Sequence, residues 1–279
     1  MTEVQRFDLI AADGTRLCGL RVLPPGARAV IALLHGLGEH AGRYERFAAA
    51  AAARGIAVVS ADLRGHGRSQ GRLGYVDCFD EYVIDADAVV GAASAQAHGL
   101  PWFLMGHSMG GVVALDWLGT RHPVPPPAGV VLSSAALKIG GDVSPWLLKL
   151  APLISALAPG LRANPLDPAA ISSIEAEAAA YAADPLVMPV APPARTAAEL
   201  LAAAGRNGAV PPRLYFPLYA MHGANDPLID VAGTRALHAA WGGADKTLRV
   251  WPESRHEVLN DRDGAAALGE IIDWISARV

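Results

Sequence analysis

The sequence predicts an α/β fold with a mostly parallel eight-stranded sheet flanked by helices, because short apolar runs alternate with longer segments of helical composition. The chain has 279 residues, of which 52% are hydrophobic, so it can bury a full core. Residues 136–212 are rich in Ala and Pro and interrupt the alternation for too long to form a loop. We therefore expect a core of residues 1–135 and 213–279, with residues 136–212 inserted as a helical cap (lid).

The expected strands are short apolar segments. The first two, residues 4–11 and 15–23, predict an antiparallel hairpin in which Asp13 and Gly14 supply the turn. The other expected strands, all apolar enough to be buried, are residues 29–36, 56–62, 102–108, 129–135, 214–223 and 246–252. The expected core helices, several of them ended by Gly or Pro, are residues 43–55, 78–99, 109–123, 229–243 and 264–279.

Charge and cysteine content narrow the classes of function. The net charge is −4 and the basic residues are scattered singly, whereas nucleic-acid binding needs a basic stripe, so no nucleic-acid partner is expected. The sequence contains no apolar run of about eighteen residues, as a membrane span requires, and its first residues lack the features of a secretory signal. Cys18 and Cys78 have no Cys or His neighbours that indicate redox or metal chemistry. We expect a cytoplasmic protein with both cysteines reduced.

The strongest local signal is the motif GHSMG at residues 106–110. It directly follows the apolar segment WFLM and directly precedes the helical segment MGGVVALDWL. A turn this sharp from strand to helix needs small residues around the serine and pushes the Ser108 hydroxyl out at the carboxyl end of the sheet. In this context the motif predicts a nucleophilic serine, and a chance match in a Gly-rich chain is the alternative.

A nucleophilic serine needs an adjacent base, and the base needs a third group to hold it. After a serine in this strand-to-helix turn, the acid comes next in the chain and the histidine last. Asp226 follows one apolar strand and His256 follows the last one, so both stand at the carboxyl end of the sheet. His238 is the other late histidine, but it lies inside a helical segment, where we expect it to pack or to face solvent. Asp230 competes with Asp226 but directly precedes a helix, which it is better placed to cap.

The oxyanion of an acyl-transfer reaction needs two backbone N–H donors. One is expected at Met109, directly after the serine, and the other at Leu37, in a turn where Gly36 and Gly38 let the backbone curl into the site. Nothing in this chemistry requires a cofactor or a metal. The charged loop of residues 62–71 has no metal-ligand spacing, and we expect it to brace the site through hydrogen bonds.

Together the motifs resemble the monoacylglycerol lipase and lysophospholipase-like branch of the α/β hydrolase superfamily, also grouped with serine aminopeptidase-like hydrolases. The resemblance covers nearly the whole chain. It rests on HGLGEHAGRYERFA, DLRGHGRSQG, YVDCFDEYVIDADAVV, FLMGHSMGG, YAADPLV, MHGANDPLID and SRHEVLND. It implies the α/β hydrolase fold with a triad of Ser108, Asp226 and His256, the same three residues that chain order selects.

The resemblance also implies a substrate and its contacts. Glu39 and Arg43 would form a polar pair near the site entrance, and Tyr181 holds the place of a tyrosine that touches the glycerol head group in such lipases. Packing within the cap is the alternative for Tyr181. The implied reaction is hydrolysis of a carboxylic ester with a medium or long acyl chain, monoacylglycerol being the best single substrate. A broad carboxylesterase or lysophospholipase is one alternative, and an inactive hydrolase-fold receptor or scaffold is another.

The cap departs most from that family. A helix can begin at Ser144 and Pro145, with Pro152 expected to bend it. Its apolar stripe consists of Trp146, Leu150, Leu153, Ile154 and Leu157. Since Lys149 is its only charge, the segment can line an acyl tunnel, touch a membrane surface or pack on the core, and packing is the default expectation. The sequence does not indicate an oligomeric state.

Overall fold

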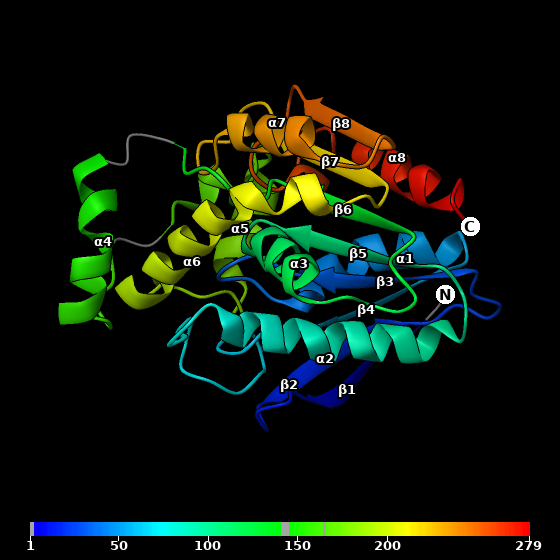
Figure 1. Ribbon diagram of the computed structural model, residues 1–279, viewed down its shortest axis with the longest axis horizontal. Coiled ribbons are helices and arrows are strands. Elements are labelled where there is room, and N and C mark those ends of the chain that lie inside the picture. The colour runs from blue at the N-terminus through cyan, green and yellow to red at the C-terminus, as the bar shows by residue number, and fades with distance from the viewer. Residues whose placement is uncertain (1–2, 141–144, 164–165) are drawn as a thin grey trace.

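An eight-stranded sheet lies at the centre of the computed structural model, which describes residues 3–140, 145–163 and 166–279, without the side chains of 145–149 (Figure 1). Its strand order is β1-β2-β4-β3-β5-β6-β7-β8. The strands are β1 (Val4–Ile10), β2 (Arg16–Val22), β3 (Ala29–Leu34), β4 (Ile56–Ala61), β5 (Trp102–His107), β6 (Gly129–Ser133), β7 (Leu218–Gly223) and β8 (Lys246–Trp251). Only the pairings β1 with β2 and β2 with β4 are antiparallel, so the predicted, mostly parallel sheet is confirmed.

The central strands are apolar because helices cover both faces of the sheet. Every residue of β3, β4, β5, β6 and β7 is buried, which is typical of parallel strands between two helical layers. The largest difference from the predicted strand ranges is in β7, which begins at Leu218 rather than at residue 214. Pro217 has no N–H to donate to either neighbouring strand, which explains why the ladder starts after it.

Five helices form the two layers. Helices α1 (Glu45–Ala53) and α8 (Gly264–Ser276) pack on one face of the sheet, around residues such as Phe47 and Ile271. The other face carries α2 (Asp80–Ala97), α3 (Met109–Thr120) and α7 (Val231–Ala240), which bury a second, larger apolar cluster. All five helices lie within the segments for which the sequence predicts helix.

Three further helices lie between β6 and β7, in the stretch for which we propose a cap. They are α4 (Pro145–Leu157), α5 (Glu175–Ala183) and α6 (Ala194–Arg206), with short 3-10 turns at Pro168–Ala170, Asn207–Ala209 and Pro211–Arg213. Helix α6 packs against α3 of the core, and α4 packs against α6 at the outer end of the molecule (Figure 1). Across the described residues, no helix combines the length and apolar character needed to cross a bilayer.

The apolar stripe of α4 is largely open to solvent. Leu150, Leu153 and Leu157 are 46%, 55% and 78% exposed, so the default expectation that the stripe packs on the core is wrong for these three. Ile154 is half-buried and, with Ala151, lines a groove beside α6. Ser144 and the side chain of Trp146 lie outside the described residues. The three leucines are exposed because only one side of α4 faces another helix, α6, and the sheet lies beyond α6.

The turn from β5 into α3 is crowded by backbone. A Cβ atom on Gly110 would lie 2.2 Å from the carbonyl oxygen of Leu34, at the end of β3. A Cβ atom on Gly106 would lie 2.4 Å from the carbonyl oxygen of Gly110. Since backbone cannot move aside as a flexible side chain can, α3 can start this close to β3 and β5 only with glycine at both positions.

We predict that Gly110→Ala lowers the free energy of unfolding by about 2 kcal/mol or more, because the added methyl group meets backbone. Gly91→Ala is the matched control: Gly91 lies on the exposed side of α2 with no atom within 4 Å of its Cβ position. There the substitution should leave stability unchanged or raise it by up to about 1 kcal/mol. Urea denaturation of both variants measures the difference, and equal stabilities would contradict the crowding described here.

Candidate active site

Ser108 stands in the sharp turn between β5 and α3. Its backbone angles are φ 52° and ψ −118°, a conformation that is strained for a residue with a side chain. The Ser108 N–H donates to the Ser133 carbonyl at 2.9 Å, which ties the turn to the end of β6. Met109 is the first residue of α3, where a backbone N–H has no acceptor within the helix. The turn therefore places the Ser108 hydroxyl at the start of α3, as the motif predicts.

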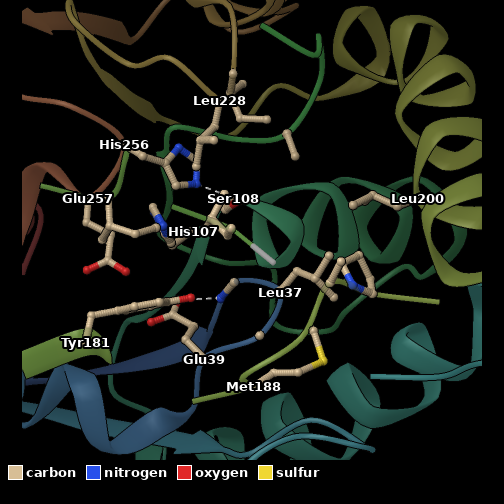
Figure 2. A pocket seen from close by; sticks show the side chains of 18 of the residues that line it. Leu37, Glu39, His107, Ser108, Tyr181, Met188, Leu200, Leu228, His256 and Glu257 are labelled. Carbon is tan, nitrogen blue, oxygen red and sulfur yellow. Dashed lines mark hydrogen bonds between the residues drawn. The ribbon is translucent and has the colours of Figure 1, made fainter. Parts of the chain in front are cut away.

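The structure brings Ser108, His256 and Asp226 together. His256 Nε2 lies 2.9 Å from Ser108 Oγ, and His256 Nδ1 lies 2.7 Å from Asp226 Oδ2 (Figure 2). Because the carboxylate can only accept, the imidazole proton is on Nδ1, and Nε2 is left to accept the hydroxyl proton of Ser108. The three side chains follow β5, β7 and β8, so the carboxyl edge of one sheet assembles them.

Three donors hold the Asp226 carboxylate. The N–H groups of Leu228 and Ile229 donate to Oδ1 at 2.8 and 3.0 Å, and His256 Nδ1 donates to Oδ2. His222 Nε2 also lies 3.1 Å from Oδ2, but it donates to the Ile229 carbonyl at 3.0 Å. Burial raises the pKa of Asp226, but the charge of His256 and the hydrogen bonds outweigh this, so its pKa lies well below the usual range. Asp226 is therefore ionised at neutral pH and fixed in orientation.

The competing residues have other roles. The Asp230 side chain accepts a hydrogen bond from the Ala232 N–H at 2.8 Å and caps α7, as predicted. His238 lies half-buried in α7, with Nε2 3.4 Å from the Lys246 carbonyl oxygen. Its predicted place in a helix, packed or facing solvent, is confirmed.

The turn after β3, residues 36–40, lies beside Ser108, and we call it the oxyanion turn after the role predicted for Leu37. Leu37 lines the same cavity as Ser108. The Gly36 N–H donates to Glu39 Oε1 at 2.6 Å, while the Gly38 carbonyl accepts from the Met188 N–H at 2.8 Å. Gly38 has φ +82°, a value that favours glycine. A bond within the turn and a bond from Met188 thus hold the backbone on either side of Leu37.

Glu39 and Arg43 form an ion pair, with Arg43 Nε 3.2 Å from Glu39 Oε2. Their side chains are only 4% and 10% exposed, so the pair is buried in the cavity wall and not at an open entrance. Arg43 also binds Glu257, and the Tyr44 hydroxyl donates to Glu39 at 2.7 Å. Two buried carboxylates, those of Glu39 and Glu257, therefore share the guanidinium of Arg43. Glu257 and Glu39 both line the cavity on the side of His256 (Figure 2).

The two carboxyls differ in acidity. Burial raises the pKa of Glu39, but nearby positive charge, including that of Arg43, and the hydrogen bond from Gly36 lower it to about 2. Burial and the negative charge of Glu39 raise the pKa of Glu257. The negative charge of the cluster therefore resides first on Glu39.

Tyr181, in α5, belongs both to the cap and to the cavity wall. It is 6% exposed and packs with Ile171 and Val187 in a small apolar cluster. Its ring also lies beneath the Arg43 guanidinium, 4.6 Å from ring centroid to Cζ, and it lines the cavity. The packing alternative and a contact with substrate are thus compatible.

A cavity of about 230 Å³ opens above Ser108. Polar groups gather at one side, around His256, Glu257 and Glu39, and apolar side chains form the rest (Figure 2). The apolar lining includes Leu37, Ile139, Leu166, Ile171, Met188, Val190, Leu200, Leu228 and Ile229. In the described parts of the chain, no group of three or more His, Cys, Asp or Glu side chains is arranged to hold a metal ion.

Comparison with known proteins agrees with this site. Residues 25–263 match the family described as "Serine aminopeptidase, S33". The chain belongs to this family. A monoacylglycerol lipase from Mycolicibacterium smegmatis is 38% identical over 251 residues, covering 89% of this chain and 88% of that protein. The monoglyceride lipase of Homo sapiens is 31% identical over 278 residues, covering 97% and 90%.

A solved structure extends the likeness to three dimensions. The crystal structure of Paleococcus ferrophilus monoacylglycerol lipase superimposes with a TM-score of 0.83 at 27% sequence identity, covering 94% of this chain and 99% of that one. The predicted α/β hydrolase fold and the family resemblance are confirmed.

Sequence reasoning missed three residues of this S33 hydrolase. His222 lies 3.1 Å from Asp226, donates to the Ile229 carbonyl and accepts from the Thr234 hydroxyl at 2.7 Å, yet it lies inside the apolar strand β7, where it resembles a packing residue. His107 lines the cavity with its ring 4.9 Å from that of His256, and burial lowers its pKa to about 4. Glu257 directly follows His256, which was itself identified. No spacing rule marks any of the three.

The pH dependence of this S33 hydrolase should follow His256. Burial lowers the pKa of the imidazole, but the charge and hydrogen bond of Asp226 outweigh burial and raise it above the usual value of 6.5. Only the neutral ring can accept a proton, so kcat/KM for a soluble ester should fall as the pH drops through this raised pKa.

We predict that Asp226→Asn lowers kcat by a factor on the order of 10⁴, because an amide at this position does not hold the proton of His256 on Nδ1.

Asp230→Asn is the matched control, because Asp230 lies four residues from Asp226 and caps a helix. Its pH profile and kcat should equal those of the wild type. Stopped assays on a nitrophenyl ester between pH 5 and 9 measure both quantities. An equal loss in both variants would show that Asp226 has no special role.

Proposed function

We propose that this S33 hydrolase cleaves carboxylic esters of medium or long acyl chains, and monoacylglycerol in particular, into an alcohol and a fatty acid through an acyl-enzyme. The observation that carries the proposal is the hydrogen-bonded series Asp226, His256, Ser108 at the floor of a mainly apolar cavity. The names of the relatives from Mycolicibacterium smegmatis and Homo sapiens support the same substrate.

In the first half of the reaction Ser108 Oγ attacks the ester carbonyl carbon, and its proton passes to His256 Nε2 over the 2.9 Å contact. The positive imidazolium is stabilised by Asp226, whose carboxylate keeps the Nδ1 proton in place. The bond between the carbonyl carbon and the alcohol oxygen then breaks, and Nε2 returns the proton to the departing alcohol. The acyl group remains bound to Ser108 Oγ.

In the second half a water molecule replaces the alcohol. His256 Nε2 takes a proton from the water as its oxygen attacks the acyl carbon, and gives that proton back to Ser108 Oγ as the fatty acid leaves. During both attacks the carbonyl oxygen becomes negative. The backbone N–H groups of Leu37 and Met109 stabilise it, because they belong to the turn and the helix start on either side of Ser108.

The cavity has an apolar part and a polar part, which bind different ends of the substrate. The acyl chain lies along the apolar wall that includes Leu200 and Leu228. The glycerol hydroxyls face the polar side, where Glu39 and the Tyr181 ring lie, with Arg43 behind them. Buried polar groups of this kind favour a head group that can form hydrogen bonds.

The test is Ser108→Ala, which removes the nucleophile and keeps the fold. Hydrolysis of monoacylglycerols and of nitrophenyl esters should fall by a factor on the order of 10⁶. Ser94→Ala, on the exposed side of α2, is the control and should retain full activity. Fatty-acid release and labelling by a fluorophosphonate probe provide two readouts. Wild-type turnover in Ser108→Ala would reject the mechanism.

A substrate panel separates the remaining alternatives. Comparison of monoacylglycerols, lysophospholipids and simple alkyl esters, each with graded chain lengths, distinguishes a monoacylglycerol lipase from a lysophospholipase or a broad carboxylesterase. If the wild type hydrolyses none of them and takes up no fluorophosphonate, a receptor or scaffold role replaces the enzymatic one.

We also propose that α4 contacts the lipid surface from which such substrates come. The support is the exposure of Leu150, Leu153 and Leu157 on one helix of the cap. Replacing Leu153 and Leu157 by Ser should weaken binding to phosphatidylcholine vesicles by about tenfold per leucine, since each loses apolar burial. Ile10→Ser, at a 62% exposed residue of β1, is the control. Vesicle co-sedimentation measures the effect, and an equal loss in the control would oppose the proposal.

A further inference from the structure

A second His–Asp pair lies next to the oxyanion turn and plays no part in the proton transfers. His40 is the last residue of the turn, and Asp184 follows α5 in the cap segment YAADPLV. His40 Nε2 lies 2.9 Å from Asp184 Oδ2, and the His40 side chain is only 6% exposed. Neither residue lines the cavity above Ser108.

We propose that Asp184 is a positioning residue, which holds the oxyanion turn in register with Ser108 through His40 and Met188. This inference rests on the proposed function, because it concerns the donor at Leu37. It assigns to the cap a task apart from substrate binding, namely to hold the Leu37 N–H where it can bind the oxyanion.

The first link runs through the tautomer of His40. The Gly42 N–H donates to His40 Nδ1 at 3.2 Å, so Nδ1 carries no proton and Nε2 carries one. That proton points at the Asp184 carboxylate. Asp184 therefore favours the one tautomer in which His40 caps the short helix Ala41–Tyr44 that follows the turn.

The second link runs through the cap backbone. Asp184 Oδ1 accepts from the Leu186 N–H at 2.8 Å, and the Asp184 carbonyl accepts from the Val187 N–H at 3.2 Å. These bonds shape the bend that places the Met188 N–H 2.8 Å from the Gly38 carbonyl. One carboxylate thus fixes both the ring of His40 and the carbonyl of Gly38, on the carboxyl-terminal side of Leu37.

The expected consequence differs from loss of a substrate contact. If the Leu37 N–H shifts by a fraction of an ångström, the developing oxyanion loses stabilisation while ground-state binding in the cavity is kept. Misplacement by about 1 Å costs on the order of 10²-fold in rate, so partial loosening should cost about tenfold.

Glu177 offers a matched comparison. It lies in α5, four residues before Tyr181, and its Oε1 lies 2.8 Å from Arg46 Nη1 on the core. Glu177→Ala therefore removes a different polar contact between cap and core, an ion pair that touches no residue of the oxyanion turn. A general loosening of the cap should affect both variants equally.

The experiment compares Asp184→Ala with Glu177→Ala on nitrophenyl butyrate, a short ester. Two inhibitors are measured beside it: an alkyl trifluoromethyl ketone, whose adduct with the serine carries an oxyanion, and an unreactive amide of the same chain length. We expect kcat/KM of Asp184→Ala to fall about tenfold, the inhibition constant of the ketone to rise by the same factor, and that of the amide to stay unchanged. Glu177→Ala should match the wild type in all three.

The inference is overturned if Asp184→Ala behaves as Glu177→Ala does, or if the ketone and the amide weaken together. If Asp184→Ala does not fold, Asp184→Asn carries the same comparison. His40 and Leu186 donate to different oxygens of the carboxylate, and Asn replaces one of these oxygens by an NH2 group that cannot accept. Failure of the proposed function looks different: the wild type itself would neither hydrolyse the ester nor bind the ketone more tightly than the amide.

Discussion

The close approach of backbone at Ser108 is the constraint on which the site depends. Because Gly106 and Gly110 carry no Cβ, α3 starts in contact with the ends of β3 and β5. This contact forces Ser108 to a positive φ and aims its hydroxyl over the sheet edge. The same approach brings the start of α3 next to the end of β3, from which the oxyanion turn follows. A single packing requirement thus places the nucleophile near both segments from which donors are predicted.

Much of this arrangement could be predicted from the sequence, since it follows from local rules. Strands buried on both faces are continuous apolar runs, and helices between them have a different period, so all eight strands were located. Because parallel strands end at one edge, Asp226 and His256 could be selected as residues that follow strands, whereas Asp230 precedes a helix and His238 lies within one. The same rule places Leu37 beside Ser108, although the two are far apart in sequence.

The rest depends on contacts that no local pattern records. His222 lies in the apolar run of β7, and its role appears only when the loop after the strand folds Asp226 back over it. Glu257 is important because Arg43, from a segment more than two hundred residues earlier, lies against it. The leucines of α4 have the spacing of a buried stripe, yet their exposure is decided by where α6 lies. In each case tertiary packing decides the role of a residue, and the local sequence pattern alone fits more than one role.

The shared guanidinium explains how the site tolerates so much buried charge. Two carboxylates and one arginine leave a net negative charge in the cavity wall, and desolvation alone would make this unfavourable. The cost is reduced because Glu39 accepts hydrogen bonds from Gly36 and Tyr44 as well as from Arg43, while the pKa of Glu257 is raised. The remaining charge lies near His256 and raises its pKa together with Asp226, which contributes more. The buried cluster therefore favours the imidazolium that each half of the proposed reaction must form. The hydrogen bond from the Gly36 N–H to Glu39 also holds the turn in which Leu37 is proposed to bind the oxyanion.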